Sequence, residues 1–240
     1  MRHILTIRYG VLKNTSDFYA AFNSLKKGDP VIIRSHRGVE FGEVVTKVKE
    51  IADDIPIENL GEILRKATPD DKEKQKNIQD EFIPFEFKFC QKKIKEHKLL
   101  MKLASVEHLF GTKKIIFYYL ANGRVDFREL VKDLAKEYQA RIEMKQIGVR
   151  DEARLLADYE HCGRELCCRS FLKNLEPVTM KMAKNQKATL DPSKISGRCG
   201  RLMCCLRYED KVYEDLKHTL PRKGSIVKTA KGTGEIVNYD

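Results

Sequence analysis

The first 50 residues alternate between hydrophobic and polar positions in short runs. The apolar run 31–33 follows the turn signal Gly-Asp-Pro at 28–30, and a second turn at 36–38 leads into the stretch 41–48. Short alternating runs between turns that contain glycine or proline are typical of half-buried β-strands. We therefore predict a β-rich, SH3-like domain over residues 1–60, built as a small barrel or as an SH3-like meander.

Residues 61–150 alternate between helical and strand periodicity. The clearest helix covers 126–138, where apolar residues recur at 127, 130, 131, 134 and 135. The other expected elements are helices over 69–82 and 91–99, and strands over 100–110, 113–121 and 140–147, with turns at 111–112 and 122–123. Two strands, a helix and a further strand predict an α/β sandwich in this part of the chain.

The pattern becomes irregular after residue 150. The stretch 150–161 (RDEARLLADYEH) predicts a helix that ends at Gly163, since glycine is favoured just after a helix. Prolines break the sequence that follows into short pieces, at Pro177, Pro192 and Pro221. Because so irregular a segment does not form a sufficient hydrophobic core by itself, we expect residues 151–220 to depend on a bound metal.

The last 20 residues, 221–240, predict a β-hairpin. They repeat the glycine-punctuated pattern of residues 27–45, which is a weak repeat signal. A hairpin alone is only marginally stable in water. We therefore expect it either to pack on other strands or to begin a strand region that continues past Asp240 in the natural protein. The chain as a whole is expected to be of the α+β class.

Six of the seven cysteines lie in two copies of one short motif. The first copy, at 161–172, reads HCGRELCCRSFL, and the second, at 199–206, reads CGRLMCCL. The seventh cysteine, Cys90, lies in the apolar stretch FEFKFC and is expected to be a small buried hydrophobic residue. The six repeated cysteines are the candidate metal ligands: Cys162, Cys167, Cys168, Cys199, Cys204 and Cys205.

Four explanations of the motif compete, and metal ligation fits best. Packing alone does not explain why six cysteines fall into two copies of one heptapeptide. Disulfides are disfavoured in a reducing cytosol, and a redox dithiol of the thioredoxin type requires Cys-x-x-Cys spacing, which neither copy has. A metal site also gives the basic residues of the motif a role, because Arg164 and Arg201 would compensate the negative charge of several thiolates.

The sequence leaves the identity of the metal open. Structural zinc sites usually show Cys-x(2–4)-Cys pairs that add up to four ligands, whereas each copy here offers a gap of four residues and then a doublet. Adjacent residues of a helix point about 100° apart, so Cys167 and Cys168 would reach different atoms of a larger cluster more easily than one ion. Two iron–sulfur clusters would need eight thiolates. His161 or partner subunits would then supply the ligands that are missing; alternatively, a single four-cysteine site leaves two thiols spare.

Composition favours a water-soluble, cytoplasmic protein with acidic partners. The longest apolar run is seven residues, 115–121, far below the ~20 that span a bilayer, and the N-terminus does not resemble a secretory signal. The formal net charge is +11. The lysine-rich stretch 91–102 is interpreted as a solvated helix face, with contact to a polyanion such as RNA as the alternative.

Four stretches together resemble a known family. They are CGRELCCRSFL, PVTMKMAKNQ, ISGRCGRLMCCLRYE and LPRKGSIVKT. They are similar to the bacterial YaaT (RicT) proteins, called stage 0 sporulation proteins, which carry a PSP-type C-terminal conserved region. That region would cover residues 61–150 here. The six cysteines of the family are all present.

The resemblance implies a non-catalytic, cytoplasmic subunit. In that family, the YaaT-type protein joins two small partner proteins in a ternary complex that binds [4Fe-4S] clusters. That complex is associated with the endoribonuclease RNase Y, mRNA processing, sporulation, competence and biofilm formation. The alternatives are a zinc-stabilised RNA-binding protein, with Zn²⁺ on the same cysteines, and a redox enzyme that uses the thiols or the clusters. No phosphate-binding glycine loop or dinucleotide motif supports an enzyme.

Overall fold

The structure is a computed structural model that describes residues 2–22, 24–46, 49–51, 60–111, 113–172, 175–230 and 232–237. Three details of the sequence-based prediction lie outside these residues, namely the end of the strand 41–48, Thr112 in the turn at 111–112, and the chain end at Asp240. The chain divides into two compact units, Met1–Leu156 and Ala157–Asp240, which are described separately. Helices and strands are both well represented, so the α+β class is confirmed.

The first unit begins with a β-barrel. Its strands are β1 (Arg2–Tyr9), β2 (Asn14–Ala20), β3 (Pro30–Ser35), β4 (Gly38–Val44) and β6 (Gly61–Lys66). They hydrogen-bond in the order β2-β6-β3-β4-β1, and the pairing of β1 with β2 closes the ring, while β5 (Lys49–Ile51) adds to β1. The inward-facing residues form one hydrophobic core that includes Leu5, Phe18 and Ile33.

Of the two predicted architectures, the small barrel is present, and its strand order differs from that of a meander. In a meander β2 would pair with β3, but β6 lies between them, parallel to β2 and antiparallel to β3. Gly61 makes this close approach possible, because a Cβ there would lie 2.1 Å from the Phe18 ring. Residues 61–66 fall in the range expected for the conserved-region domain, yet they complete the barrel.

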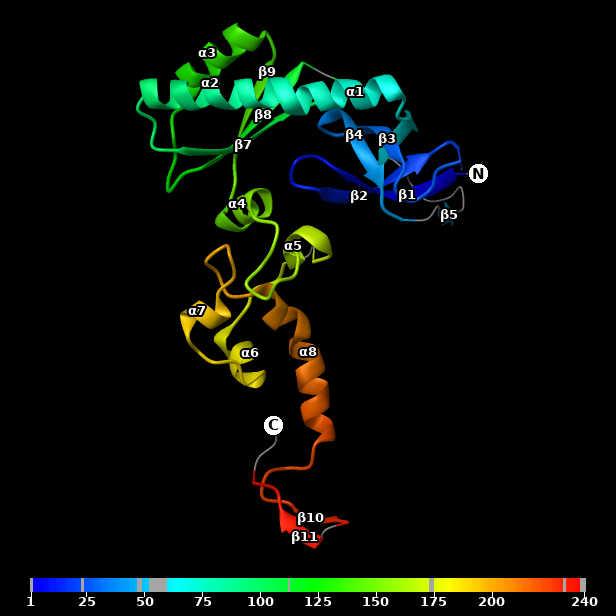
Figure 1. Ribbon diagram of the computed structural model, residues 1–240, viewed down its shortest axis with the longest axis vertical. Coiled ribbons are helices and arrows are strands. Elements are labelled where there is room, and N and C mark those ends of the chain that lie inside the picture. Colours follow the sequence, from blue (N-terminus) through cyan, green and yellow to red (C-terminus); the bar gives the residue numbers. More distant parts are fainter. Residues whose placement is uncertain are drawn as a thin grey trace. The chain divides into compact units, whose positions relative to one another are not determined.

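One long helical stretch follows the barrel. It consists of α1 (Pro69–Asn77), a π-helical turn η1 (Ile78–Phe82) and α2 (Ile83–Glu96), which follow one another without a gap (Figure 1). The prediction of a separate helix over 91–99 is therefore wrong. The helix continues through Pro84 because a π-turn, here η1, is a local adjustment that lets a helix pass a proline.

A three-stranded sheet packs beside this helical stretch. Its strands are β7 (Lys102–His108), β8 (Lys114–Leu120) and β9 (Arg141–Gln146), in the order β7-β8-β9 with β9 parallel to β8. One face packs against α2 and α3 (Arg128–Tyr138), and the other face packs against the β1–β2 turn and α4 (Val149–Leu156). The expected strands and the helix within 126–138 are thus confirmed. Cys90 of α2 is fully buried as expected, and burial raises the pKa of its thiol to about 12.

A buried ion network joins the barrel to this sheet. Arg37, in the β3–β4 turn, donates to both carboxylate oxygens of Glu107 on β7, at 2.9 Å and 2.8 Å, and also pairs with Glu40. Tyr118 of β8 donates to Glu107 at 2.6 Å, and the backbone N–H of Val11 donates to it at 3.1 Å. Because the charges are paired and hydrogen-bonded, the network fixes the two parts against each other within the first unit.

The second unit consists mainly of short helices. They are α5 (Cys167–Ser170), α6 (Met180–Asn185) and α7 (Pro192–Ile195), followed by the longer α8 (Cys204–Thr219). Ala183, Ile195 and Leu206 form a small core, so this segment has some apolar packing of its own. The hairpin expected at the end is present as β10 (Ile226–Thr229) and β11 (Gly232–Glu235).

The helix predicted over 150–161 is shorter than expected. It ends as α4 at Leu156, and Gly163 does not cap it. Residues 158–166 instead form a tight turn, in which the N–H of Leu166 donates to the carbonyl of Asp158 at 3.3 Å. Within the described part of the chain, no helix combines the length and the apolar character that crossing a membrane requires.

Candidate functional site

The first cysteine motif forms a short reversal of the chain followed by a helix. Tyr159 and Glu165 form an isolated antiparallel bridge, and the N–H of Gly163 donates to the carbonyl of Glu160 at 2.9 Å. Cys162 lies in the turn, beside Gly163. Helix α5 begins at Cys167, so the cysteine doublet forms its first two residues.

The second motif repeats this arrangement 37 residues later. Ser196 and Leu202 form the equivalent bridge, and the N–H of Gly200 donates to the carbonyl of Gly197 at 2.8 Å. Helix α8 begins at Cys204, again with the doublet as its first two residues. The sequence repeat is therefore a structural repeat, in which a turn carries one cysteine and a helix start carries two.

The glycine of each motif has a backbone role. Gly163 has φ +77° and Gly200 has φ +72°, in the left-handed region that residues with a Cβ rarely adopt. Among the described atoms, nothing lies within 4 Å of the position that a Cβ would occupy on either glycine. The reason for glycine is thus the turn itself, which sets the position of the preceding cysteine.

The two motifs contact each other. Phe171, just after the first doublet, packs edge-to-face on Tyr208, just after the second, with ring centroids 5.1 Å apart. The carboxylate of Glu160 accepts from the N–H of Arg198 at 3.0 Å and 3.1 Å. These two contacts hold the two cysteine motifs, which are 37 residues apart in the sequence, against each other.

Four thiols from the two motifs share one neighbourhood. Burial raises the pKa of Cys167 most, and the nearby thiols of Cys204 and Cys162 raise it further, with a side-chain hydrogen bond to Cys204. Burial also raises the pKa of Cys205 to about 11, with Cys167, Glu209 and Cys204 as smaller causes. Thiolates at Cys162 and Cys204 would therefore repel one at Cys167, and thiolates at Cys167 and Cys204 would repel one at Cys205, so a bound cation would remove repulsion among these four residues.

The remaining predicted residues are placed differently. Cys168 is buried and Cys199 is half-buried. Arg164 and Arg201 are exposed, and their side chains form no ion pair with any described residue. His161 is exposed and lies 3.7 Å from the Glu160 carboxylate. The pKa shifts thus link four of the six predicted cysteines, namely Cys162, Cys167, Cys204 and Cys205.

The cysteine thiols of the two motifs are chemically suited to bind a metal centre as thiolates. Cysteine thiolates are the ligands of iron–sulfur clusters and of many zinc sites. Across the described ranges, no three Cys, His, Asp or Glu side chains have the arrangement of a site for one metal ion. Because a cluster offers several iron atoms, it accepts thiols that do not converge on a single point.

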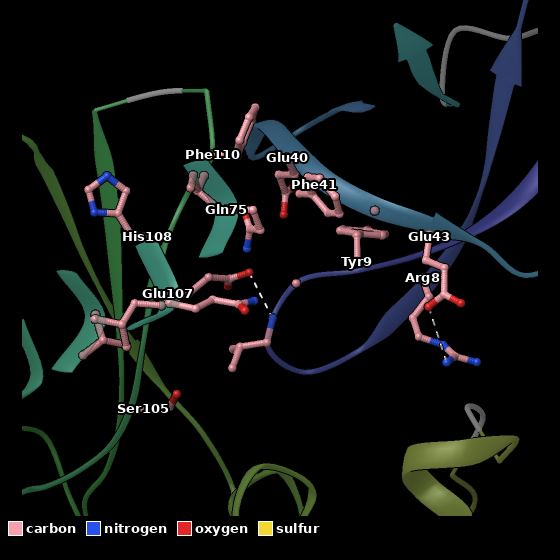
Figure 2. Close-up of a pocket in the computed structure, with 17 residues that line it drawn as sticks. Arg8, Tyr9, Glu40, Phe41, Glu43, Gln75, Ser105, Glu107, His108 and Phe110 are labelled. Atoms are coloured by element: carbon pink, nitrogen blue, oxygen red, sulfur yellow. Dashed lines mark hydrogen bonds and ion pairs between the residues drawn. The ribbon is translucent and has the colours of Figure 1, made fainter. Parts of the chain in front are cut away.

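A second candidate site is a cleft in the first unit. It has a volume of about 480 Å³ and lies between the barrel, the long helical stretch and β7. Figure 2 shows Tyr9 and Phe41 of the barrel facing Gln75 of α1 and Glu107 of β7. The buried Oε1 of Gln75 has no hydrogen-bond partner in the described part of the chain.

A histidine–glutamate pair lies beside this cleft, and sequence reasoning missed it. His108, which lines the cleft, has Nδ1 2.7 Å from Oε1 of Glu86, a residue that is 3% exposed. The two residues are 22 positions apart and come from a helix and a strand. No local pattern signals such a pair, because only the packing of α2 on β7 brings the two side chains together.

Comparison with known proteins identifies two conserved regions. Residues 61–147 match the PSP1 C-terminal conserved region, and residues 177–220 match the third domain of PSP1-like proteins. These matches define the class as PSP1-type proteins, and the second region contains Cys199, Cys204 and Cys205. No solved structure matches the chain significantly.

Three curated proteins are similar to the chain. It is 49% identical over 213 residues to the stage 0 sporulation protein YaaT of Bacillus subtilis, covering 88% of this chain and 76% of that protein. An uncharacterised protein of Schizosaccharomyces pombe is 32% identical over 50% of this chain and 20% of its own length. Protein PSP1 of Saccharomyces cerevisiae is 47% identical over 19% of this chain and 5% of its own length. The chain belongs to the YaaT family of PSP1-type proteins.

Proposed function

We propose that this protein is a non-catalytic subunit that binds an iron–sulfur cluster, [4Fe-4S] in type, through its two cysteine motifs. The observation that carries the proposal is the shared neighbourhood of Cys162, Cys167, Cys204 and Cys205. Thiols from both motifs come together, and four thiolates are the usual number for one cluster. When bound, the cluster would supply a centre that responds to oxygen, iron or electrons.

The protein's own residues would position and protect that centre. The two left-handed glycines set the turns that carry Cys162 and Cys199, and the contact of Phe171 with Tyr208 holds the two motifs against each other. Cys168 and Cys199 remain as additional thiols. In the proposal they take part in a second centre, to which a partner protein contributes the ligands that this chain lacks.

The family membership supports a cellular role in sporulation. The relative in Bacillus subtilis is named a stage 0 sporulation protein, and 49% identity across 88% of the chain supports a shared role. We propose further that the protein acts in the cytoplasm in a ternary complex with two small partner proteins. That complex would assist mRNA processing by RNase Y and thereby competence and biofilm development.

Anaerobic purification tests the cluster. The protein should be brown, should contain iron and acid-labile sulfide in about equal amounts, and should lose both on exposure to air. A Cys204→Ser variant should retain less iron, whereas Cys90→Ser should retain the wild-type amount. A colourless protein that contains zinc in place of iron would contradict the proposal and support the zinc alternative.

The structure gives the RNA-binding alternative little support. The lysine-rich end of α2 is partly neutralised, because Lys93 lies 2.8 Å from Glu96 and 3.4 Å from Asp133, and Lys92 lies 3.8 Å from Glu96. A lysine that neutralises a phosphate releases the counterion condensed on the nucleic acid, and a lysine that is already paired with a carboxylate contributes less to such binding. A steep salt dependence of binding to single-stranded RNA would favour that alternative, and weak binding that is insensitive to salt would count against it.

A further inference from the structure

The cleft of the first unit contains more negative than positive charge. Its lining includes three carboxylates, those of Glu40, Glu43 and Glu107, and one arginine, Arg8, with no lysine among the described residues. Arg37, which is not part of the lining, pairs with both Glu40 and Glu107. These two carboxylates, 3% and 7% exposed, thus share one guanidinium, and one buried negative charge has no cation of its own. Because a buried charge is costly unless it is paired, the cleft favours a cation.

The other basic groups that line the cleft do not supply this cation. Arg8 lies 4.0 Å from the carboxylate of Glu43, so it offsets that charge at an exposed position. His108 lies 2.7 Å from Oε1 of Glu86, which is a further buried carboxylate. Each of these two groups therefore already faces a carboxylate of its own, and the charge shared by Glu40 and Glu107 remains in excess.

The cleft also has unused hydrogen-bond acceptors. An ionised carboxylate has sites for about four hydrogen bonds. Glu107 uses four, with donors from two nitrogens of Arg37, the hydroxyl of Tyr118 and the N–H of Val11. Oε2 of Glu40, however, accepts from Arg37 alone, and the buried Oε1 of Gln75 accepts from no described group. The acceptors that remain on Glu40 and Gln75 favour a ligand that donates hydrogen bonds.

Aromatic side chains form much of the remaining wall. Tyr9, Phe41 and Phe110 line the cleft, and the rings of Phe41 and Phe110 pack edge-to-face with centroids 6.0 Å apart. Figure 2 shows the carboxylate of Glu40 and the amide of Gln75 on either side of the cleft, with Tyr9 and Phe41 beside them. Aromatic rings attract organic cations through their negative faces and pack against the attached carbon chain. Carboxylates and aromatic rings together are therefore suited to an organic cation.

The size and the lining of the cleft favour an organic cation over a metal ion. Its volume of about 480 Å³ lies within the range of about 300–1,000 Å³ that is usual for pockets that bind organic molecules. In the part of the chain that the structure describes, no three Cys, His, Asp or Glu side chains are arranged to hold a metal ion. A cation with several N–H donors and a carbon chain meets all the features of this cleft.

We infer that the cleft binds an alkylammonium group, the cationic end of a free polyamine or of a lysine side chain. Its N–H groups would donate to Oε2 of Glu40 and Oε1 of Gln75, and its methylene chain would pack against Phe41. The bound cation would pair with the excess carboxylate charge. This site goes beyond the proposed function and is independent of it, because the described lining of the cleft contains no cysteine.

Isothermal titration calorimetry of the full chain tests the site with two probes, spermidine and Nα-acetyl-lysine amide. Physiological salt suppresses unspecific attraction of cations to exposed carboxylates. We expect saturable one-to-one binding. Tighter binding of spermidine assigns the site to a free polyamine, and tighter binding of the lysine probe assigns it to a lysine side chain of another protein. Triacetylspermidine, which has the same chain without the charges, should not bind. Equal binding of this neutral compound, or no binding of either probe at millimolar concentration, would overturn the inference.

Variants of the lining locate the binding. Gln75→Leu should weaken binding about tenfold, as expected for a hydrogen bond to a charged group, and Phe41→Leu should weaken it about fivefold through loss of the aromatic face. Gln91→Leu and Phe85→Leu are matched controls, because both residues are exposed on α2 and do not line the cleft. Without ligand, Gln75→Leu should not lower the unfolding temperature, since it removes a buried polar atom that has no described partner. Equal affinities of Gln75→Leu and Gln91→Leu would refute the site.

Discussion

Phe171 and Tyr208 occupy equivalent positions in the two cysteine motifs, and their rings pack against each other with centroids 5.1 Å apart at an angle of 66°. The contact joins two helix starts, each of which carries a cysteine doublet. Because α5 has four residues and is too short to be stable alone, its position depends on this contact with α8. The pair is therefore part of the framework of the thiol site.

The aromatic pair should be coupled energetically. We expect Phe171→Ala and Tyr208→Ala each to destabilise the second unit, and a double-mutant cycle to give a coupling of about 0.5–1.5 kcal/mol. Thermal unfolding of the full chain, combined with proteolysis between the motifs, measures this coupling free energy. Strictly additive effects would mean that the two rings do not support each other. Tyr159→Ala is a control, since Tyr159 is exposed and forms no described ring contact.

The two glycines of the motifs should resist substitution. Gly163→Ala and Gly200→Ala would each place a Cβ at a positive φ, at a cost of about 1–2 kcal/mol. We expect lower unfolding temperatures and weaker retention of metal in both variants. Gly123→Ala is the matched control, because Gly123 does not have a positive φ and no described atom lies within 4 Å of the position that its new methyl group would occupy. An equal effect of all three substitutions would argue against a special role of the turns.

The ion network of the first unit should be sensitive to loss of one partner. Arg37→Ala leaves the buried carboxylates of Glu40 and Glu107 without their cation, and we expect a loss of about 3–5 kcal/mol. Chemical denaturation of the full chain measures the change. Arg34→Ala, which removes an exposed ion pair with Glu62, should cost less than about 1 kcal/mol. A similarly small effect of Arg37→Ala would show that the network does not join the barrel to the sheet.

The start of α1 should lose stability in acid. Asp71 accepts from Arg65 and from the N-cap residue Thr68, and these contacts hold its pKa well below the usual range. A carboxylate with a lowered folded-state pKa stabilises the fold above its unfolded pKa of about 3.9, and this contribution is lost as the pH falls through the folded value. The difference in unfolding temperature between wild type and Asp71→Asn should therefore shrink from pH 6 towards pH 2. A constant difference would contradict this assignment.

The sequence predicted those elements that depend on local pattern. The helix within 126–138, the strands within 100–121 and the final hairpin follow from periodicity and turn residues, and burial of Cys90 follows from its apolar neighbours. The repeated cysteine motif is recognisable in the amino-acid sequence. The structure shows that the two copies also share a conformation, because each forms the same turn followed by the start of a helix. What the sequence did not reveal is that the copies contact each other through Phe171 and Tyr208.

The remaining features depend on tertiary contacts. Insertion of β6 between β2 and β3 requires that Gly61 approach Phe18, which no local pattern encodes. The pairs Arg37–Glu107 and His108–Glu86 join residues 70 and 22 positions apart. The helix predicted over 150–161 ended early because the turn at 158–166 competed with it, and helical periodicity alone does not show such a turn.

In the proposed function, thiols of both motifs bind one iron–sulfur centre. Iron and acid-labile sulfide measured on the anaerobically purified chain, beside the variants Cys167→Ser, Cys204→Ser and Cys90→Ser, test it most directly. We expect iron and sulfide in equal amounts in the wild type and in Cys90→Ser, and a large loss in both motif variants. Iron that survives the loss of either Cys167 or Cys204, or a wild-type protein that holds zinc alone, would contradict it.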